Sequence, residues 1–276
     1  MRVKKFDLFL TIGPNDFSII KHSLKVNKKN ILGYSNIYLF NENKTFNIKN
    51  TTNINPSFFP FTFEYVQNKV ANKSRAGWIF QQLIKLYFPL LQSESENVLV
   101  VDSDVFFLRE TNFFDGNKEI FTVSGEFHPP YFEHMLRVHP EFKREHNNSG
   151  ISHHMLFNKK KLTSMFEAVE KLHNKPFYEV YLDAINSEEK SPCADYEIYF
   201  HYVCREFQDE IKIRELKWSN ENCINKDILS GHDFFSLPYY SNTRPNQFWK
   251  NIRKGNFERA YICLINSYYL FFSKKI

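Results

Sequence analysis

Two carboxylates separated by one small residue, Asp102 and Asp104 around Ser103, directly follow the apolar run Val98-Leu-Val-Val101. A continuous run of Val and Leu is typical of a strand that is buried on both faces. In an extended chain residues i and i+2 point to the same side, so both carboxylates would project from the carboxyl end of the strand. Two such anions repel each other unless a cation lies between them. Because Mg²⁺ and Mn²⁺ prefer oxygen ligands, the motif predicts a divalent metal site, with a solvated turn as the alternative.

A helix with an unusual polar face is expected immediately before that strand, over residues 74–87. At 100° per residue one arc is apolar, holding Ala76, Ile79, Phe80, Leu83, Ile84, Leu86 and Tyr87. The opposite arc combines cations, amides and an indole without any acid, holding Arg75, Trp78, Gln81, Gln82 and Lys85. This face is either solvated or directs its donors at the phosphates of a ligand.

The elements that must position these residues alternate between strands and helices. Strands are expected at 6–12, 36–40, 98–101, 120–124 and 148–157. Helices are expected at 17–24, 74–87, 161–173 and 195–203, with Asp16 as the N-cap of the first. The segment 127–139, rich in histidine and aromatic residues, is expected to be a loop. A strand, helix, strand opening is typical of a wound α/β sheet.

Composition narrows the class of protein. Aromatic residues make up 17% of the 276 residues, which indicates a globular chain. The net charge of +5 is dispersed, so we do not expect nucleic acid as a partner. The cysteines, Cys193, Cys204, Cys223 and Cys263, form no C-x-x-C pair, so we expect thiols rather than a zinc site or a disulfide framework.

The segment 260–272 is the most apolar stretch near the C-terminus, and Lys274 and Lys275 follow it. It is shorter than the roughly 20 residues that span a bilayer. We expect a packing helix there, with peripheral membrane contact as the alternative. The chain opens with a strand-like segment and shows no signal peptide, so a cytoplasmic location is expected.

Taken in order, these motifs resemble those of the GT-A glycosyltransferases. The similarity is closest to a bacterial and viral group with G-W-x-x-Q-Q-x-x-K, D-S-D, S-G-I-S-H-H-M-L-F and S-x-Y-E-I-Y motifs, and it is more distant to glycogenin-type enzymes. The matching segments lie at 77–85, 101–104, 149–157 and 194–199. The resemblance implies a mixed α/β GT-A sheet flanked by helices. It also implies a nucleotide-sugar transferase domain over 1–245 and a C-terminal helical extension over 246–276.

The resemblance implies a role for the metal motif. Asp102 and Asp104 would bind Mn²⁺ (or Mg²⁺) and, through it, the diphosphate of the donor. The metal would act as a Lewis acid for the departing nucleotide diphosphate. His232, in Gly231-His-Asp233, would be the third ligand, with an ordinary loop histidine as the alternative. Glycogenin-type enzymes carry a histidine-glycine-lysine signature, of which only the histidine has a counterpart here.

The resemblance also implies a donor site beyond the metal. The base and ribose of a uridine nucleotide would lie against residues of the first turn, namely Thr11, Asn15 and Asp16. The diphosphate or the donor sugar would lie against side chains that follow later in the chain, namely Arg75, Trp78, Gln82, Lys85 and Ser103.

Three further residues are expected to belong to the site, His153 as a donor-binding residue and two acids. His153 and His154 are adjacent and face opposite sides of a strand, so we expect His153 to line the site and His154 to join the core. The resemblance implies that Asp195 and Glu197 are the catalytic acids near the reacting sugar, with acids that only complement the dipole at a helix N-terminus as the alternative. In an inverting enzyme one of them would deprotonate the acceptor hydroxyl, and in a retaining enzyme it would orient the sugar.

The sequence therefore predicts a metal-dependent glycosyltransferase that moves a sugar from a nucleotide diphosphate, UDP above all, to a hydroxyl of a carbohydrate or other acceptor. Two alternatives stay open. A sugar nucleotidyltransferase also uses metal-binding acids on a wound sheet, although it favours a glycine-rich first loop and this turn offers only Gly13. A carbohydrate-binding protein could retain the fold without the chemistry.

Overall fold

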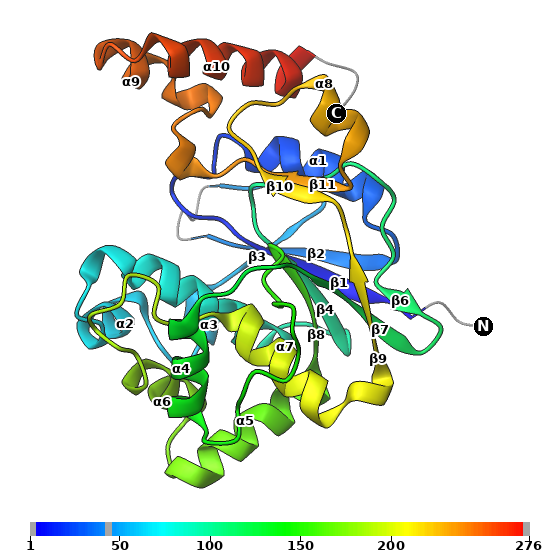
Figure 1. Cartoon of the computed structure of the whole chain (residues 1–276), viewed down its shortest axis with the longest axis vertical. Helices are drawn as coiled ribbons and strands as arrows, with labels where there is room; N and C mark the ends of the chain where they lie inside the picture. The colour runs from blue at the N-terminus through cyan, green and yellow to red at the C-terminus, as the bar shows by residue number, and fades with distance from the viewer. Residues whose placement is uncertain (1–3, 42–45, 273–276) are drawn as a thin grey trace. The chain divides into compact units, whose positions relative to one another are not determined.

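The structure, a computed structural model, describes residues 4–41 and 46–272 (Figure 1). The chain divides into two compact units and passes between them five times. Unit 1 consists of Met1–Thr11, Gly33–Val101 and Phe113–Glu215. Unit 2 consists of Ile12–Leu32, Asp102–Asn112 and Leu216–Ile276. Among the described residues no helix is long and apolar enough to cross a membrane.

Unit 1 is built on a five-stranded sheet in the order β3-β2-β1-β4-β8. The strands are β1 (Phe6–Thr11), β2 (Tyr34–Phe40), β3 (Thr52–Ile54), β4 (Asn97–Val101) and β8 (His154–Asn158). Neighbouring strands are parallel except β8, which is antiparallel to β4. Every residue of β1, β4 and β8 is buried, as their continuous apolar runs predict.

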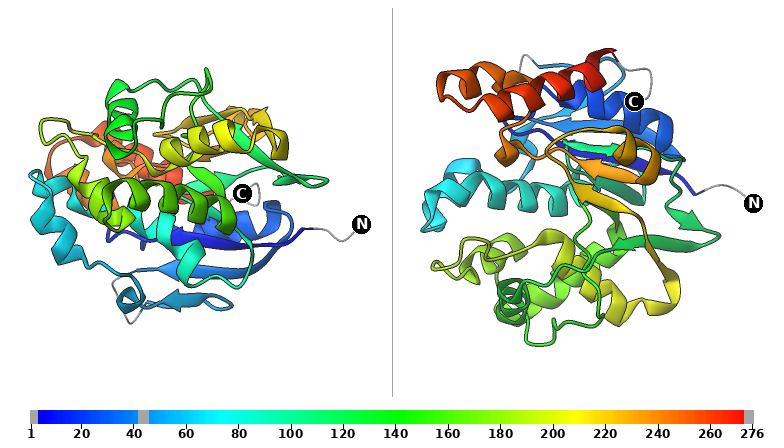
Figure 2. Two further views of the ribbon diagram at one scale, coloured as in Figure 1. Left: turned by 90° about the horizontal axis from the view of Figure 1, so that it is seen from below. Right: turned by 45° about the horizontal axis from the view of Figure 1, so that its top comes forward.

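Helices flank this sheet, so the predicted mixed α/β class is confirmed. The helices of unit 1 are α2 (Phe63–Lys69), α3 (Ala76–Leu91), α4 (Pro129–Val138), α5 (Lys159–His173), α6 (Phe177–Asp183) and α7 (Asp195–Glu206). Of these, α3, α5 and α7 lie together against one face of the sheet (Figures 1 and 2). A smaller sheet orders β6 (Phe114–Asp115), β7 (Lys118–Val123) and β9 (Ile211–Glu215).

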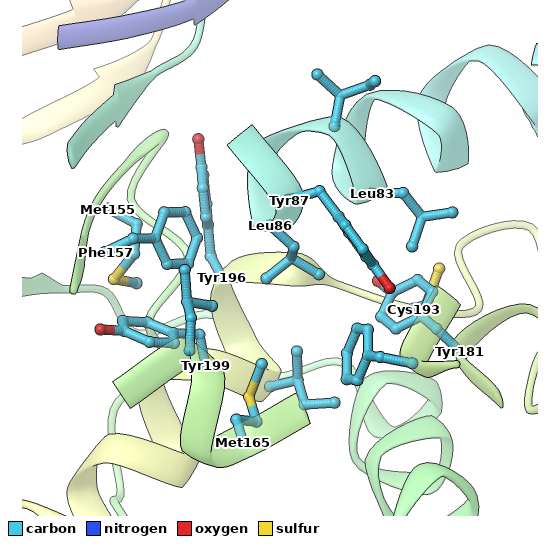
Figure 3. Close-up of a cluster of buried hydrophobic side chains, with 14 of the residues drawn as sticks. Leu83, Leu86, Tyr87, Met155, Phe157, Met165, Tyr181, Cys193, Tyr196 and Tyr199 are labelled. Atoms are coloured by element: carbon cyan, nitrogen blue, oxygen red, sulfur yellow. The ribbon is translucent and has the colours of Figure 1, made fainter. Parts of the chain in front are cut away.

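Aromatic rings fill the core of unit 1. Leu83, Leu86 and Tyr87 of α3 point toward side chains of β8, α5 and α7 (Figure 3). The Phe9 and Phe88 rings stack with centroids 3.8 Å apart. Because burial of one such side chain contributes about 1.5–3 kcal/mol, this layer fixes α3 on the sheet.

Unit 2 has a three-stranded sheet in the order β10-β11-β5. Its strands are β5 (Val105–Phe107), β10 (Trp218–Asn220) and β11 (Phe234–Ser236), and its helices are α1 (Ile20–Asn30), α8 (Lys226–Gly231), α9 (Phe248–Arg253) and α10 (Phe257–Ser267). A π-helical turn, Tyr268–Phe272, follows α10. Short 3₁₀ helices in the two units lie at Pro56–Phe58, Lys73–Arg75, Gln208–Glu210, Tyr239–Ser241 and Pro245–Gln247.

Amide side chains of α1 attach this helix to β5. Asn27 donates to the Val105 carbonyl and accepts from the Phe107 amide, both at 2.9 Å. Asn30 donates to the Phe107 carbonyl at 2.6 Å. These buried bonds replace ladder partners that the edge strand β5 would otherwise need.

Three sequence-based expectations are wrong in detail. The first helix begins at Ile20 rather than at residue 17, and its N-cap, Ile19, makes no side-chain bond, so Asp16 is not its cap. Most of the segment 127–139 is the helix α4, because two prolines occupy its first turn, where proline is tolerated. The expected strand 148–157 begins only at His154.

Candidate functional site

Arg244 lies at the centre of a buried ion cluster in unit 2. Its side chain is 0% exposed. Its guanidinium donates to Asp16 Oδ1 at 2.5 Å and to Asp104 Oδ2 at 2.8 Å. It also donates to the carbonyls of Asn15 at 3.0 Å and Leu237 at 2.8 Å. The cation beside Asp104 in this structure is therefore an arginine of the same chain.

Asp16 connects this cluster to the metal motif through a second bond. Its Oδ2 accepts from Ser103 Oγ at 2.7 Å and from the Gly13 amide at 3.2 Å. The predicted residues Asn15, Asp16, Ser103 and Asp104 are thus brought together. They join the loop that follows β1 to the turn that follows β4.

The backbone around Asp102 and Asp104 is a turn, so the expectation of an extended strand there is wrong. The Val105 amide donates to the Asp102 carbonyl at 3.2 Å, closing the turn between β4 and β5. The Leu237 amide donates to the Asp104 carbonyl at 3.0 Å. The alternation rule of strands consequently does not apply to this pair.

The side chains of the motif match a hard divalent cation in chemistry. Asp102 is half-buried, and the side chain of Asp104 is 19% exposed. However, among the described residues no three His, Cys, Asp or Glu side chains are grouped as they would be around a metal ion. His232 follows α8 and its buried Nδ1 makes no hydrogen bond, but the structure does not gather it with both aspartates as a three-ligand set.

In unit 1 the polar face of α3 contacts α6, the start of α7 and the segment just before it. Lys85 Nζ lies 3.8 Å from Asp195 Oδ2 and 4.6 Å from the centroid of the Tyr196 ring. Gln82 accepts from the Tyr181 hydroxyl at 2.5 Å and donates to the Cys193 carbonyl at 3.3 Å. Lys85 and Gln82 are buried, so a solvated face is excluded for both.

Glu197 lies in the first turn of α7, and three donors surround its carboxylate. It accepts from Ser149 Oγ at 2.7 Å and from the Gly150 amide at 2.9 Å. His201 Nε2 lies 3.3 Å from Oε1. Because His201 Nδ1 accepts from the Glu145 amide at 3.0 Å, Nε2 carries the proton and donates to Glu197. This arrangement favours a supporting role for Glu197 over that of a general base.

The same bonds explain why the strand β8 starts late. Glu197 fixes the backbone at Ser149 and Gly150 in a loop. A Cβ at Gly150 would lie 2.4 Å from the Cβ of Phe200, so only glycine fits against α7. His153 then adopts a left-handed φ of 60°, a conformation that costs a non-glycine residue energy and recurs at functional sites.

The remaining predicted residues of unit 1 lie in three places. The Arg75 guanidinium stacks 4.0 Å from the centroid of the Trp78 ring and donates to Ser191 Oγ at 3.2 Å. Thr11 is buried at the end of β1, opposite Phe40. His153 is half-buried, whereas His154 is in the core as expected, with Nε2 2.9 Å from Thr122 Oγ1.

No family model matches this chain, and no curated protein does. Among solved structures the chain is similar to mouse xyloside xylosyltransferase 1 in its apo form. The match covers 86% of this chain and 99% of that chain, with 9% sequence identity and a TM-score of 0.44. That likeness is too distant to carry an activity.

A cavity of about 530 Å³ in unit 1 has Asn97, the first residue of β4, in its lining. Lys161 and Glu119 form a buried ion pair of 3.1 Å in its wall, and burial raises the pKa of Glu119. This cavity contains none of the predicted donor-binding residues.

Arg244 is the residue of the site that sequence patterns missed. It lies 140 positions from Asp104 and 228 from Asp16, in a loop without helical or strand periodicity. One feature of the sequence could have indicated such a residue. A pair of aspartates in an apolar context needs a cation nearby, and an arginine can be that cation as well as a metal can.

Proposed function

We propose that this chain is a metal-dependent glycosyltransferase that uses a nucleotide diphosphate sugar, UDP-linked above all, and a hydroxyl acceptor. The observation that carries the proposal is the joined pair of loops in unit 2. The turn with Asp102 and Asp104 is bonded through Ser103 and Arg244 to Asp16, in the loop after β1.

Sheet topology supports a ligand site for these two loops. In the order β3-β2-β1-β4-β8, the chain builds outward from β1 in both directions. The parallel neighbours β1 and β4 therefore flank the point where the strand order reverses. In open α/β sheets, ligands bind beyond the carboxyl ends of the strands at such a point. Both loops leave those carboxyl ends.

Asp102 and Asp104 are the residues that would bind Mn²⁺ or Mg²⁺. The metal would supply charge neutralisation for the leaving nucleotide diphosphate, and donor phosphates and water would complete its oxygen shell. Arg244 would restrict the carboxylate of Asp104 to one orientation before any ligand binds. Among the predicted catalytic acids we favour Asp195, since three donors already surround Glu197.

The test is the melting temperature of the full chain with Mn²⁺, with UDP, and with both. We expect a clear rise only with both, because a ligand present at 100 times its Kd adds about 2.7 kcal/mol to stability. Asp102→Asn should abolish the rise. Asp227→Asn, which removes an exposed acid of α8 in the same unit, should preserve it. An unchanged melting temperature with UDP-, GDP- and CMP-sugars would contradict the proposal.

Product analysis separates the proposal from its alternatives. Slow release of UDP from one UDP-sugar identifies the donor and supports transfer. Release of pyrophosphate from a nucleoside triphosphate and a sugar phosphate would instead show a nucleotidyltransferase. Sugar binding that needs neither metal nor nucleotide would show a carbohydrate-binding protein.

A further inference from the structure

One row of large apolar side chains on the C-terminal helix is exposed. Seven of the twelve exposed large hydrophobic residues in the described part of the chain lie between Tyr240 and Phe271. Five of them repeat at helical spacing and form what we call the aromatic stripe: Phe257 (67% exposed), Tyr261 (65%), Leu264 (51%), Tyr268 (59%) and Phe271 (54%). Contiguous apolar surface of this kind marks a site of interaction.

The aromatic stripe is separate from the face by which α10 packs in unit 2. That face is buried and includes Ala260, Cys263 and Asn266. Asn266 accepts from the Ile224 amide at 2.8 Å and donates to the carbonyls of Asn222 and Thr243, both at 2.9 Å. The helix is therefore already fixed in place, and the stripe is additional surface.

Basic side chains accompany the stripe. The helix α1 exposes Lys21, Lys25 and Lys29 at intervals of one helical turn. The ring of His22, next to Lys21, lies 4.4 Å from the ring of Phe271 at the end of the stripe. Exposed cations also occur on and beside α9 and α10, at Lys250, Arg253, Lys254 and Arg259.

Charge differs sharply between the units. Unit 2 has fourteen Lys and Arg against eight Asp and Glu, a net charge of +6. The whole chain has +5, so unit 1 has −1. From residue 240 to the end the only acid in the sequence is Glu258. Lys274 and Lys275, which contribute to this count, lie outside the described residues.

We propose that unit 2 docks on an anionic lipid surface through the aromatic stripe, with the lysines of α1 and the cations of α9 and α10 directed at lipid head groups. Tyr, Trp and Phe are favoured at the membrane interface, and each Lys or Arg near an anionic leaflet adds attraction. A second copy of the chain would bring two strongly positive surfaces together. Charge complementarity therefore favours lipid.

The test is co-sedimentation of the full chain with vesicles of phosphatidylcholine, with and without phosphatidylserine. Binding should require phosphatidylserine and weaken as salt is raised, because salt screens exposed charges. Equal binding to both vesicles, or no binding to either, would overturn the proposal. So would a dimer in light scattering that Leu264→Ser dissociates.

Matched variants locate the surface. Leu264 and Leu172 are both 51% exposed, one on α10 and one on α5. Leu264→Ser should weaken vesicle binding about tenfold, whereas Leu172→Ser should leave it unchanged. Equal effects of the two variants would contradict the assignment of the stripe.

The charge variants are matched in the same way. Lys21→Glu with Lys25→Glu should weaken binding by about tenfold or more. Lys118→Glu with Lys171→Glu, at exposed sites of unit 1, should have little effect. If a variant lowers the melting temperature, the fluorescence of Trp249, which is 66% exposed, provides a second measurement. Vesicles should shift the emission of the wild type, and Trp249→Phe should remove that shift; its persistence would count against contact at α9.

Discussion

Arg244 in unit 2 and Lys85 in unit 1 are both buried beside carboxylates, and their contacts differ. In unit 2 Arg244 makes hydrogen bonds to two aspartates and two carbonyls, at 2.5–3.0 Å. In unit 1 Lys85 lies 3.8 Å from Asp195, beyond hydrogen-bond distance. Arg244 is therefore held by a network of hydrogen bonds, whereas the contact between Lys85 and Asp195 is an ion pair without a hydrogen bond between the two side chains.

This difference indicates different uses for the two cations. The planar guanidinium presents its donors in a fixed fork, so Arg244 sets the orientation of Asp16 and Asp104 together. An ammonium is a compact point charge on a flexible stem. An exchange of partners would cost Arg244 several hydrogen bonds. The arginine is therefore suited to position other side chains.

Removing the arginine should have the largest effect on stability. Arg244→Met leaves Asp16 and Asp104 in place without their cation, so we expect a loss of about 3–5 kcal/mol in the free energy of unfolding. Denaturant titration measures it. Arg259→Met, at an exposed position of α10, should change stability by less than about 0.5 kcal/mol. Losses of similar size in the two variants would contradict the network.

Unit 1 also buries a basic group whose ring donates to a backbone carbonyl, and this group should respond to acid. His134 is fully buried and donates from Nε2 to the Tyr181 carbonyl at 2.9 Å. Burial lowers its pKa from 6.5 to about 4. The unfolded chain therefore takes up a proton at a higher pH than the folded chain. Stability should be complete above pH 6.5 and fall between 6.5 and 4, by on the order of 3 kcal/mol.

The variant His134→Gln separates this titration from other acid effects. Glutamine retains a donor for the Tyr181 carbonyl but does not titrate in this range. The difference in unfolding free energy between wild type and variant should narrow as pH falls from 6.5 to 4. A difference independent of pH would exclude His134 as the source.

Local signals were sufficient where continuous runs of sequence determine structure. The apolar runs of β1 and β4 predicted those strands, and the helical periodicity of residues 74–87 predicted α3, because burial on a regular face repeats at a fixed interval. The strand at 148–157 was predicted too long. The first half of this segment is held in a loop by the hydrogen bond from Ser149 to Glu197, 48 positions away, and a local sequence pattern cannot indicate such a distant contact.

The sequence predicted which residues form the site more accurately than it predicted the backbone geometry that holds them. It placed Asp16, Ser103 and Asp104 in one site, and they do meet. It assumed an extended backbone at the motif, where the structure has a turn, and it missed Arg244. The chemistry of a carboxylate pair can be recognised from three residues. The cation that binds Asp104 of this pair is Arg244, and it comes from a loop 140 positions later in the chain.

Removing Lys85 should change the free energy of unfolding least. Its coupling with Asp195 also allows a direct comparison with the coupling between Arg244 and Asp104. Lys85→Met removes a buried ion pair and a contact with the Tyr196 ring, so we expect a loss below that of Arg244→Met, because the Lys85 pair has no hydrogen bond between its side chains. Lys160→Met, at a side chain that is 84% exposed, is the control and should be nearly neutral. In double-mutant cycles the coupling of Lys85 with Asp195→Asn should be well below that of Arg244 with Asp104→Asn, since only the latter includes hydrogen bonds. Equal couplings would mean that charge alone, and not the geometry of the guanidinium, determines both clusters.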